Sequence, residues 1–197
     1  ACKRLANVVG QDAVVIGQGS AGLFFNTMLR RMGARRIIGL DVKPARVEAG
    51  VAFGATTTVN TANRDARQVV EEITVGRMAD LVVEAAGEAE TINLAAQLVK
   101  EKGQLLYFGV PRQLGFTFDF WSFFRRYCNT FTSAESMFEP GRTSFHHALE
   151  LIGRGEIDVS TMVTHRFPFE QVAQAYQLAK TREDGAIKVV VEMPHHR

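Results

Sequence analysis

The sequence has little cysteine, no long apolar run and no large excess of charge of either sign. Its 197 residues include two cysteines, Cys2 and Cys128, which form no CxxC motif. Their number and spacing argue against a disulfide framework and a zinc knuckle, and favour a reducing compartment. No apolar run approaches the about 18 residues of a membrane span, and no signal-peptide pattern is present. We therefore expect a soluble, cytoplasmic protein.

The charge balance bears on the kinds of partner. The chain has 23 basic and 21 acidic residues and a formal net charge of +2. Such a balance provides no electrostatic footprint for nucleic acid, and the aromatic stretch from Phe116 to Tyr127 has few basic residues. The histidines at His146, His147 and His165 have no matching ligands at metal-site spacing. We expect no nucleic acid, no membrane and no metal bound by these residues.

Short apolar runs alternate with amphipathic helical patterns along the first part of the chain. The runs that predict strands buried on both faces are residues 13–16, 37–40, 57–59, 81–83 and 104–108. Helical periodicity between them predicts helices over 20–32, 44–53, 65–74 and 92–99, the first with an apolar face of Ala21, Phe24, Phe25, Met28, Leu29 and Met32. This alternation predicts a doubly wound α/β fold with a parallel sheet, the Rossmann arrangement.

The pattern changes after Pro111. An aromatic-rich stretch leads into a sixth predicted strand over 129–134, and a helix follows over 145–152. Beyond it we predict a strand over 162–167, a helix over 172–179 and a strand over 187–191. The predicted organisation is a dinucleotide-binding domain over 1–153 and a C-terminal α+β extension over 154–197.

The strongest local signal is the run Gly17-Gln18-Gly19-Ser20-Ala21-Gly22, which lies between a predicted strand and a predicted helix. Gly17 allows a tight turn, Gly19 lets a pyrophosphate approach the backbone, and Gly22 lets the helix pack close to the sheet. The helix N-terminus at Ser20 and Ala21 offers N–H groups and a positive dipole end to phosphates. These five residues are candidate cofactor ligands.

Asp41 follows the second predicted strand, 24 residues after Gly17. A carboxylate in this position accepts hydrogen bonds from the hydroxyls of an adenosine ribose and repels a 2′-phosphate, which favours NAD over NADP. Lys43 and Arg46 leave the alternative open, because basic side chains nearby could hold that phosphate. Together with Val42, these residues complete the candidate adenosine site.

Two further strand ends are candidate parts of the site. Ala86 and Gly87 follow the fourth predicted strand, and Phe108, Gly109 and Val110 lie at the end of the fifth. Ligands of such folds bind at the carboxyl ends of the strands, near the point where the strand order reverses. Small residues there leave room for an adenine or nicotinamide ring.

Taken together, these motifs resemble the medium-chain dehydrogenase/reductase superfamily, in its zinc alcohol dehydrogenase-like branch. The resemblance rests on Val14 to Leu23, Asp41 to Arg46, the Phe53-Gly54-Ala55 triplet and the segments 80–87 and 103–109, and continues through 150–190. The sorbitol and threonine dehydrogenases are the nearest branch. The resemblance implies a nicotinamide cofactor and hydride transfer to or from an alcohol, polyol or ketone polarised by zinc.

The sequence departs from that family in one respect. The GroES-like barrel that precedes this region in the family, with its zinc ligands, has no counterpart here. We therefore expect a cofactor-binding half that is inactive alone, with zinc only in a full-length enzyme and its C-terminal segment completing the missing domain. The alternatives are a non-catalytic dinucleotide sensor or scaffold and a zinc-independent NADPH quinone or enoyl reductase. The edge strand at 129–134 predicts a homo-oligomer, a dimer or a tetramer.

Overall fold

The computed structural model describes residues 1–133 and 139–194. Its contacts divide the chain into two compact units, Ala1–Ala134 and Glu135–Arg197. The helix that we predicted over 145–152 belongs to the second unit, and the domain boundary after residue 153 stays a prediction about the intact protein.

The first unit is built on a six-stranded sheet with the order β3-β2-β1-β4-β5-β6. Every neighbouring pair is parallel, which confirms the predicted fold class. The chain runs outward from β1 to β3, then returns to place β4 beside β1, so the strand order reverses between β1 and β4. The strands are β1 (Asp12–Ile16), β2 (Arg36–Asp41), β3 (Thr57–Asn60), β4 (Ala79–Glu84), β5 (Val99–Tyr107) and β6 (Asn129–Thr132).

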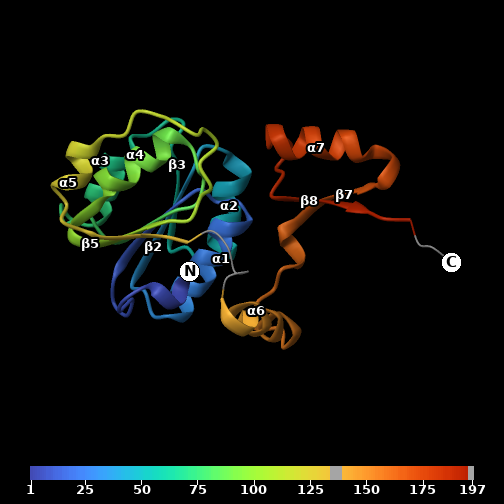
Figure 1. Ribbon diagram of the computed structural model, residues 1–197, viewed down its shortest axis with the longest axis horizontal. Helices are drawn as coiled ribbons and strands as arrows, with labels where there is room; N and C mark the ends of the chain where they lie inside the picture. Colours follow the sequence, from blue (N-terminus) through green and yellow to red (C-terminus); the bar gives the residue numbers. More distant parts are fainter. Residues whose placement is uncertain (134–138, 195–197) are drawn as a thin grey trace. The chain divides into compact units, whose positions relative to one another are not determined.

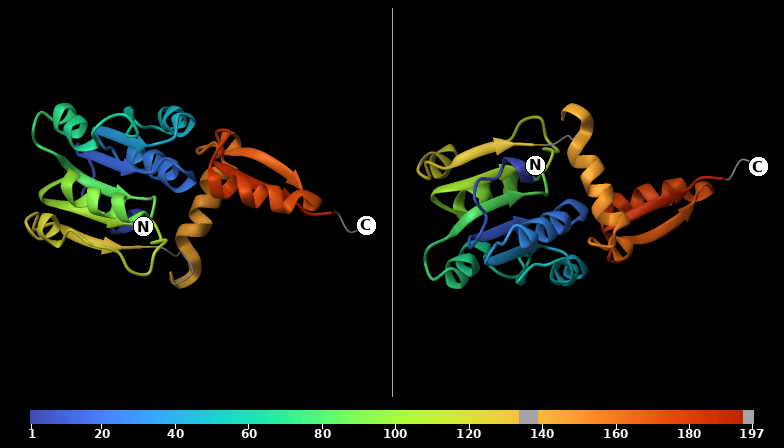
Figure 2. Two further views of the ribbon diagram at one scale, coloured as in Figure 1. Left: turned by 90° about the horizontal axis from the view of Figure 1, so that it is seen from above. Right: turned by 90° about the horizontal axis from the view of Figure 1, so that it is seen from below.

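Helices cover both faces of this sheet (Figure 1). One face carries α1 (Ser20–Arg31) and α2 (Pro44–Ala52). The other carries α3 (Ala66–Ile73), α4 (Ala89–Leu98) and the short α5 (Phe120–Phe124). Figure 2 shows the unit from above and below, with β6 at the edge of the sheet. The N-terminal 3-10 helix η1 (Cys2–Arg4) contacts α1.

The core lies in two clusters, one on each side of the sheet. Val14 and Ile16 of β1 pack in the cluster that includes residues of α3 and α4. Ala13 and Val15 pack in the other cluster, with Phe25 of α1. Because alternate side chains of a strand point to opposite faces, a strand covered on both sides needs an unbroken apolar run. This is why the runs in the sequence located the central strands.

Two predicted elements differ in the structure. Val99 does not end the fourth helix but begins β5, where it pairs with Ala79 before the register shifts. The fifth strand therefore starts five residues before the predicted Gln104 and ends at Tyr107. The extra residues, Lys100 to Gly103, have no apolar pattern that would predict a strand. They lie between the pairs Ala79–Val99 and Leu81–Gln104, where the register of β4 and β5 shifts, and Lys100 forms an ion pair with Asp80.

The predicted apolar face of α1 was also partly wrong. Phe25 and Leu29 are buried as expected, but the other buried residues are Gly22, Leu23 and Asn26. A Cβ on Gly22 would lie 1.8 Å from the carbonyl oxygen of Gly17, so this side of the helix packs directly on the glycine turn. That contact turns Leu23 and Asn26 inward and leaves Phe24 and Met28 half-buried.

The second unit contains a β-α-β arrangement after a helix. The strands β7 (Val163–Pro168) and β8 (Lys188–Glu192) are parallel, and α7 (Val172–Thr181) packs against both. Helix α6 (Thr143–Gly153) precedes them. Three 3-10 turns complete the unit, η2 (Pro140–Arg142), η3 (Ser160–Met162) and η4 (Phe169–Gln171). The four elements predicted after residue 144 are therefore present. Ala134, the last residue of the predicted sixth strand, lies outside the described residues.

Candidate functional site

The glycine turn after β1 has the geometry that the sequence predicts. Gly17 has φ +90°, a conformation that L side chains rarely adopt, and its N–H donates to the Leu40 carbonyl at 2.7 Å. Helix α1 begins at Ser20, and among the described residues no side chain caps it. The first N–H groups of this helix, at Ser20, Ala21 and Gly22, therefore receive no hydrogen bond from a capping side chain. Such a helix end attracts anions.

A buried glutamine supports this turn from below. Gln18 is fully buried; its Nε2 donates to the Val15 carbonyl at 3.0 Å, and its Oε1 accepts from Asn26 Nδ2 at 2.6 Å. Its side chain occupies space that two glycines leave open. A Cβ on Gly39 or on Gly50 would lie 2.8 Å from Gln18 Oε1. Sequence reasoning missed this role, because polar residues are rarely fully buried and the motif leaves this position open.

Asp41 ends β2 beside the glycine turn. Its Oδ2 accepts from the Gln18 N–H at 2.7 Å, and its Oδ1 accepts from the Lys43 N–H at 2.9 Å. Each carboxylate oxygen has a second lone pair, so both can still accept from a ligand hydroxyl. The backbone bonds hold this carboxylate in one orientation. Val42, next to it, is exposed.

Arg46, on the first turns of α2, lies over the glycine turn. Its NH1 is 3.3 Å from the position that a Cβ on Gly19 would take. Burial lowers the pKa of Arg46, the nearby charge of Asp41 counteracts this, and Arg112 adds to the lowering. A larger residue at Gly19 would therefore crowd the Arg46 guanidinium. Lys43 is the N-cap residue of α2.

The ends of β4 and β5 meet in a second pair of turns. Gly87 has φ +75°, and a Cβ on it would lie 2.2 Å from the Val110 carbonyl oxygen. A Cβ on Gly109 would lie 2.3 Å from the Gly87 nitrogen. The two turns therefore touch through their backbones. Phe108 is fixed by an edge-to-face contact with Phe25, with ring centroids 5.0 Å apart.

These two groups of residues adjoin each other. A Cβ on Gly17 would lie 3.2 Å from Ala86 Cβ, so the turn after β1 contacts the turn after β4. This is the point where the strand order reverses, and dinucleotides bind there in open parallel sheets. The structure thus brings all the predicted site residues to the carboxyl edge of β1, β2, β4 and β5. Their part in binding a cofactor stays a prediction.

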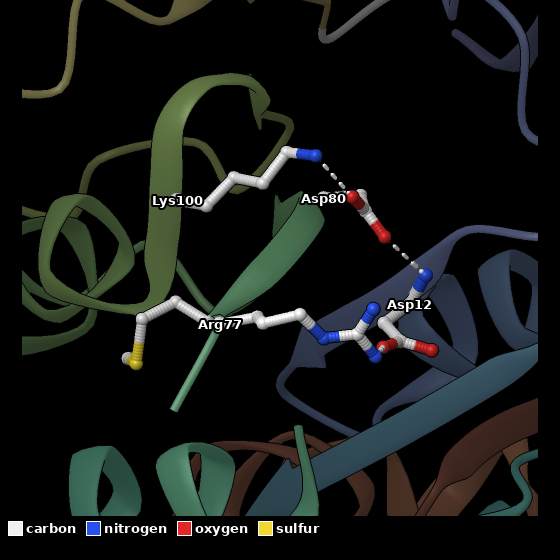
Figure 3. A pocket seen from close by; sticks show the side chains of 5 residues that line it. Asp12, Arg77, Asp80 and Lys100 are labelled. Atoms are coloured by element: carbon white, nitrogen blue, oxygen red, sulfur yellow. Dashed lines mark hydrogen bonds and ion pairs between the residues drawn. The ribbon is translucent and has the colours of Figure 1, made fainter. Parts of the chain in front are cut away.

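A hollow of about 250 Å³ lies at the opposite, amino edge of the strands (Figure 3). Its charged groups are paired with one another. Asp12, almost fully buried, accepts from Arg35 at 2.6 and 2.9 Å and lies 3.4 Å from Arg77 NH2. Asp80 pairs with Lys100 and accepts from the Asp12 N–H at 2.7 Å. These ion pairs and hydrogen bonds link the amino ends of β1, β4 and β5, at the edge of the sheet opposite the candidate site.

Among residues 1–133 and 139–194, no group of three or more His, Cys, Asp or Glu side chains could hold a metal ion. No helix in the same part of the chain has both the length and the apolar character for crossing a bilayer.

Comparison with known proteins identifies the family. Residues 21–154 match the model of the zinc-binding dehydrogenase family, and the chain belongs to this family. It is 27% identical over 197 residues to the probable D-xylulose reductase A of Emericella nidulans, covering 97% of this chain and 53% of the relative. It is 28% identical over 192 residues to sorbitol dehydrogenase of Bacillus subtilis, covering 92% and 50%.

A solved structure of an alcohol dehydrogenase has the same fold over nearly the whole of this chain. Alcohol dehydrogenase TADH from Thermus sp. ATN1 superposes with a TM-score of 0.81 at 26% identity, covering 94% of this chain and 53% of that one. The chain therefore spans about half the length of the relatives it matches. It corresponds to the part of these oxidoreductases that binds the nicotinamide cofactor.

Proposed function

We propose that the chain binds NAD(H) along the carboxyl edge of β1, β2, β4 and β5, in preference to NADP(H). The observation that carries this proposal is the Asp41 carboxylate, fixed by two backbone N–H groups at 2.7 and 2.9 Å beside the glycine turn. Its remaining lone pairs suit ribose hydroxyls, and its charge opposes a 2′-phosphate. Arg46 and Lys43 favour the alternative, NADP(H), because their positive charges could hold a 2′-phosphate.

The residues present fit a dinucleotide. The N–H groups at Ser20 to Gly22 and the Arg46 guanidinium would hold the pyrophosphate, and Asp41 would orient the adenosine ribose. The turns at Ala86–Gly87 and Phe108–Val110 would position the nicotinamide ring. When bound, the nicotinamide supplies a carbon that accepts or donates a hydride.

The activity of the intact protein follows as a further proposal. Relatives named as D-xylulose reductase, sorbitol dehydrogenase and alcohol dehydrogenase support hydride transfer between the nicotinamide and a small alcohol, polyol or ketone. We propose that the zinc ligands and the substrate pocket belong to a further domain. The 197-residue chain alone would then bind cofactor and show little turnover.

The edge strand and the cysteines bear on the oligomeric state and the cellular location that we propose. Among the described residues β6 pairs only with β5 and forms the edge of the sheet, where the Thr132 carbonyl accepts from Arg4 at 2.6 Å. An edge strand invites pairing with a second copy, which supports a homodimer or a tetramer. The Cys2 and Cys128 thiols are both free, which suits the cytoplasm.

Titration of the chain with NADH and with NADPH, followed by NADH fluorescence and calorimetry, tests the proposal. We expect NADH to bind at least about tenfold more tightly than NADPH, about 1.4 kcal/mol. Equal affinities would refute the preference for NAD, and the absence of binding by either would refute the proposed function. Turnover of sorbitol, threonine or a simple alcohol at about 1 per second or more would refute the inactivity of the isolated chain.

A further inference from the structure

Glu84 is a buried carboxylate that the proposed function does not use directly. It is the last residue of β4, and none of its surface is exposed. Burying a carboxylate is costly unless hydrogen bonds replace its water. The fourth strand was predicted over 81–83, and the sequence indicated no role for Glu84.

The hydrogen bonds of this carboxylate come from the turn that follows β4 and from the start of α4. Glu84 Oε1 accepts from the N–H of Ala86, the N–H of Gly87 and the Oγ1 of Thr91, each at 2.8 Å. Thr91 lies on the first turn of α4 and also accepts from the Glu88 N–H at 3.2 Å. One oxygen atom therefore fixes both the turn and the start of the helix.

The same residue also contacts the turn after β5. The backbone carbonyl of Glu84 accepts from the N–H of Phe108 at 2.8 Å and of Gly109 at 3.0 Å. Its second carboxylate oxygen, Oε2, is buried and accepts no hydrogen bond from a described residue. It lies 2.6 Å from the position of a Cβ on Gly109, so it closes the space beneath that glycine.

These contacts add to the backbone contacts that already join the two turns. Gly87 and Gly109 have no side chains, and their backbones approach each other so closely that neither accommodates a Cβ. A carboxylate with a side chain of this length fills the space between them and also satisfies the N–H groups. An apolar residue would leave those buried donors without an acceptor, which is unfavourable.

We infer that Glu84 is a positioning residue for the nicotinamide half of the site. This inference rests on the proposed function. A doubly wound sheet has two mononucleotide-binding halves. The glycine turn and Asp41 belong to the adenosine half, so the turns after β4 and β5 belong to the nicotinamide half. The Glu84 carboxylate contacts the turn after β4, Thr91 of α4 and the space beneath Gly109, and none of these belongs to the adenosine half. Its loss should therefore affect the nicotinamide end and spare the adenosine end.

The test compares NADH with ADP-ribose, which lacks the nicotinamide. Glu84→Asp keeps the charge but shortens the side chain, so its oxygen no longer reaches both turns. Glu84→Gln keeps the length and the accepting oxygen but removes the charge. Thr74→Val is the control, because Thr74 is also fully buried and accepts from the Met78 N–H, but at the opposite edge of the sheet. Calorimetry measures both ligands, and hydrogen exchange follows the amides of Ala86 and Gly87.

We expect Glu84→Asp to weaken NADH by about tenfold or more and to leave ADP-ribose within about threefold. Its Ala86 and Gly87 amides should exchange faster than in the unmodified chain. Glu84→Gln and Thr74→Val should bind both ligands within about threefold of the unmodified chain. Equal losses for both ligands in Glu84→Asp, unchanged NADH binding, or unchanged amide exchange would overturn the inference. If the unmodified chain binds both NADH and ADP-ribose, any of these three outcomes refutes only the role of Glu84. If the unmodified chain binds neither ligand, the proposed function fails and the inference fails with it.

Discussion

Gly22→Ala tests the closest contact of the candidate site. A Cβ at this position would lie 1.8 Å from the Gly17 carbonyl oxygen and 2.9 Å from its carbon. A methyl group and a carbonyl oxygen need about 3.3 Å, so the helix and the turn must separate by about 1.5 Å. The clash is with backbone, and no side-chain rotation can relieve it.

The size of the effect follows from two opposing terms. Overpacking of this kind costs about 1–3 kcal/mol, and a clash with backbone belongs at the upper end. Alanine is favoured over glycine inside a helix by about 0.5–1 kcal/mol. The free energy of unfolding should therefore fall by about 2 kcal/mol. NADH affinity should fall by about tenfold or more, because the N–H groups of Ser20 and Ala21 move away from the turn.

Urea unfolding followed by circular dichroism measures the first effect, and NADH titration below the unfolding transition measures the second. Gly153→Ala is the matched control, since Gly153 also lies in a helix and a Cβ there has no atom within 4 Å. It should leave NADH binding unchanged and the free energy of unfolding equal or slightly higher. Wild-type stability and NADH affinity in Gly22→Ala would refute the packing argument.

Three further predictions concern the ribose carboxylate, the sheet edge and the opposite end of the strands. Asp41→Ala should weaken NADH by about 1.5–3 kcal/mol and narrow the gap to NADPH, measured by titration, because a charged acceptor is lost. Thr132→Pro should abolish dimerisation, measured by light scattering. The Ser133 N–H donates to the Tyr107 carbonyl within the sheet, so the alternation of the strand places the Thr132 N–H on the outer side of β6, and proline removes this N–H. Burial alone would raise the pKa of Asp80, but the hydrogen bond from Lys100, the Asp12 N–H and the charges of Lys100 and Arg35 together lower it below 3.8. The stability that Asp80 contributes is thus present above about pH 3.8 and is lost as the pH falls through the lower pKa of the folded state. Asp80→Asn should remove this pH dependence of the free energy of unfolding, measured by urea unfolding from pH 6 to pH 2.

Each of these predictions has a control or a contrary outcome. Asp41→Ala loses the bonds to both the Gln18 and the Lys43 N–H groups, whereas Asp41→Asn removes the charge but keeps one of these two bonds, and it should therefore bind NADH better than Asp41→Ala. Thr132→Val keeps the N–H and should dimerise normally; an unmodified monomer, or a folded Thr132→Pro dimer, contradicts the edge model. Parallel acid profiles for Asp80→Asn and the unmodified chain would show that Asp80 contributes no pH-dependent stability.

Most of the fold was predictable from the sequence because its signals are local. The central strands are buried on both faces, so runs such as Ala13 to Ile16 stand out without knowledge of their neighbours. The glycine turn and Asp41 were equally accessible, since a phosphate-binding turn needs glycines at set positions and a carboxylate after the second strand. The structure placed these residues together at one edge of the sheet, as the motif predicts.

The parts that the sequence did not predict depend on contacts between distant segments. Gln18 fits only because Gly39 and Gly50, from β2 and α2, leave space for its side chain. One oxygen of Glu84 accepts hydrogen bonds from the turn that follows it and from Thr91, and no rule of sequence spacing identifies such a residue. The early start of β5 depends on β4, because Val99 pairs with Ala79 and no local pattern predicts a strand there.

A crystal structure of the chain with bound NADH tests the central claim most directly. The account predicts a pyrophosphate on the N–H groups at Ser20 to Gly22 and beside Arg46, ribose hydroxyls on Asp41, and the nicotinamide against the turns at Gly87 and Gly109. A dinucleotide bound elsewhere, such as in the charged hollow beside Arg77 and Lys100, or a ribose turned away from Asp41, would contradict it.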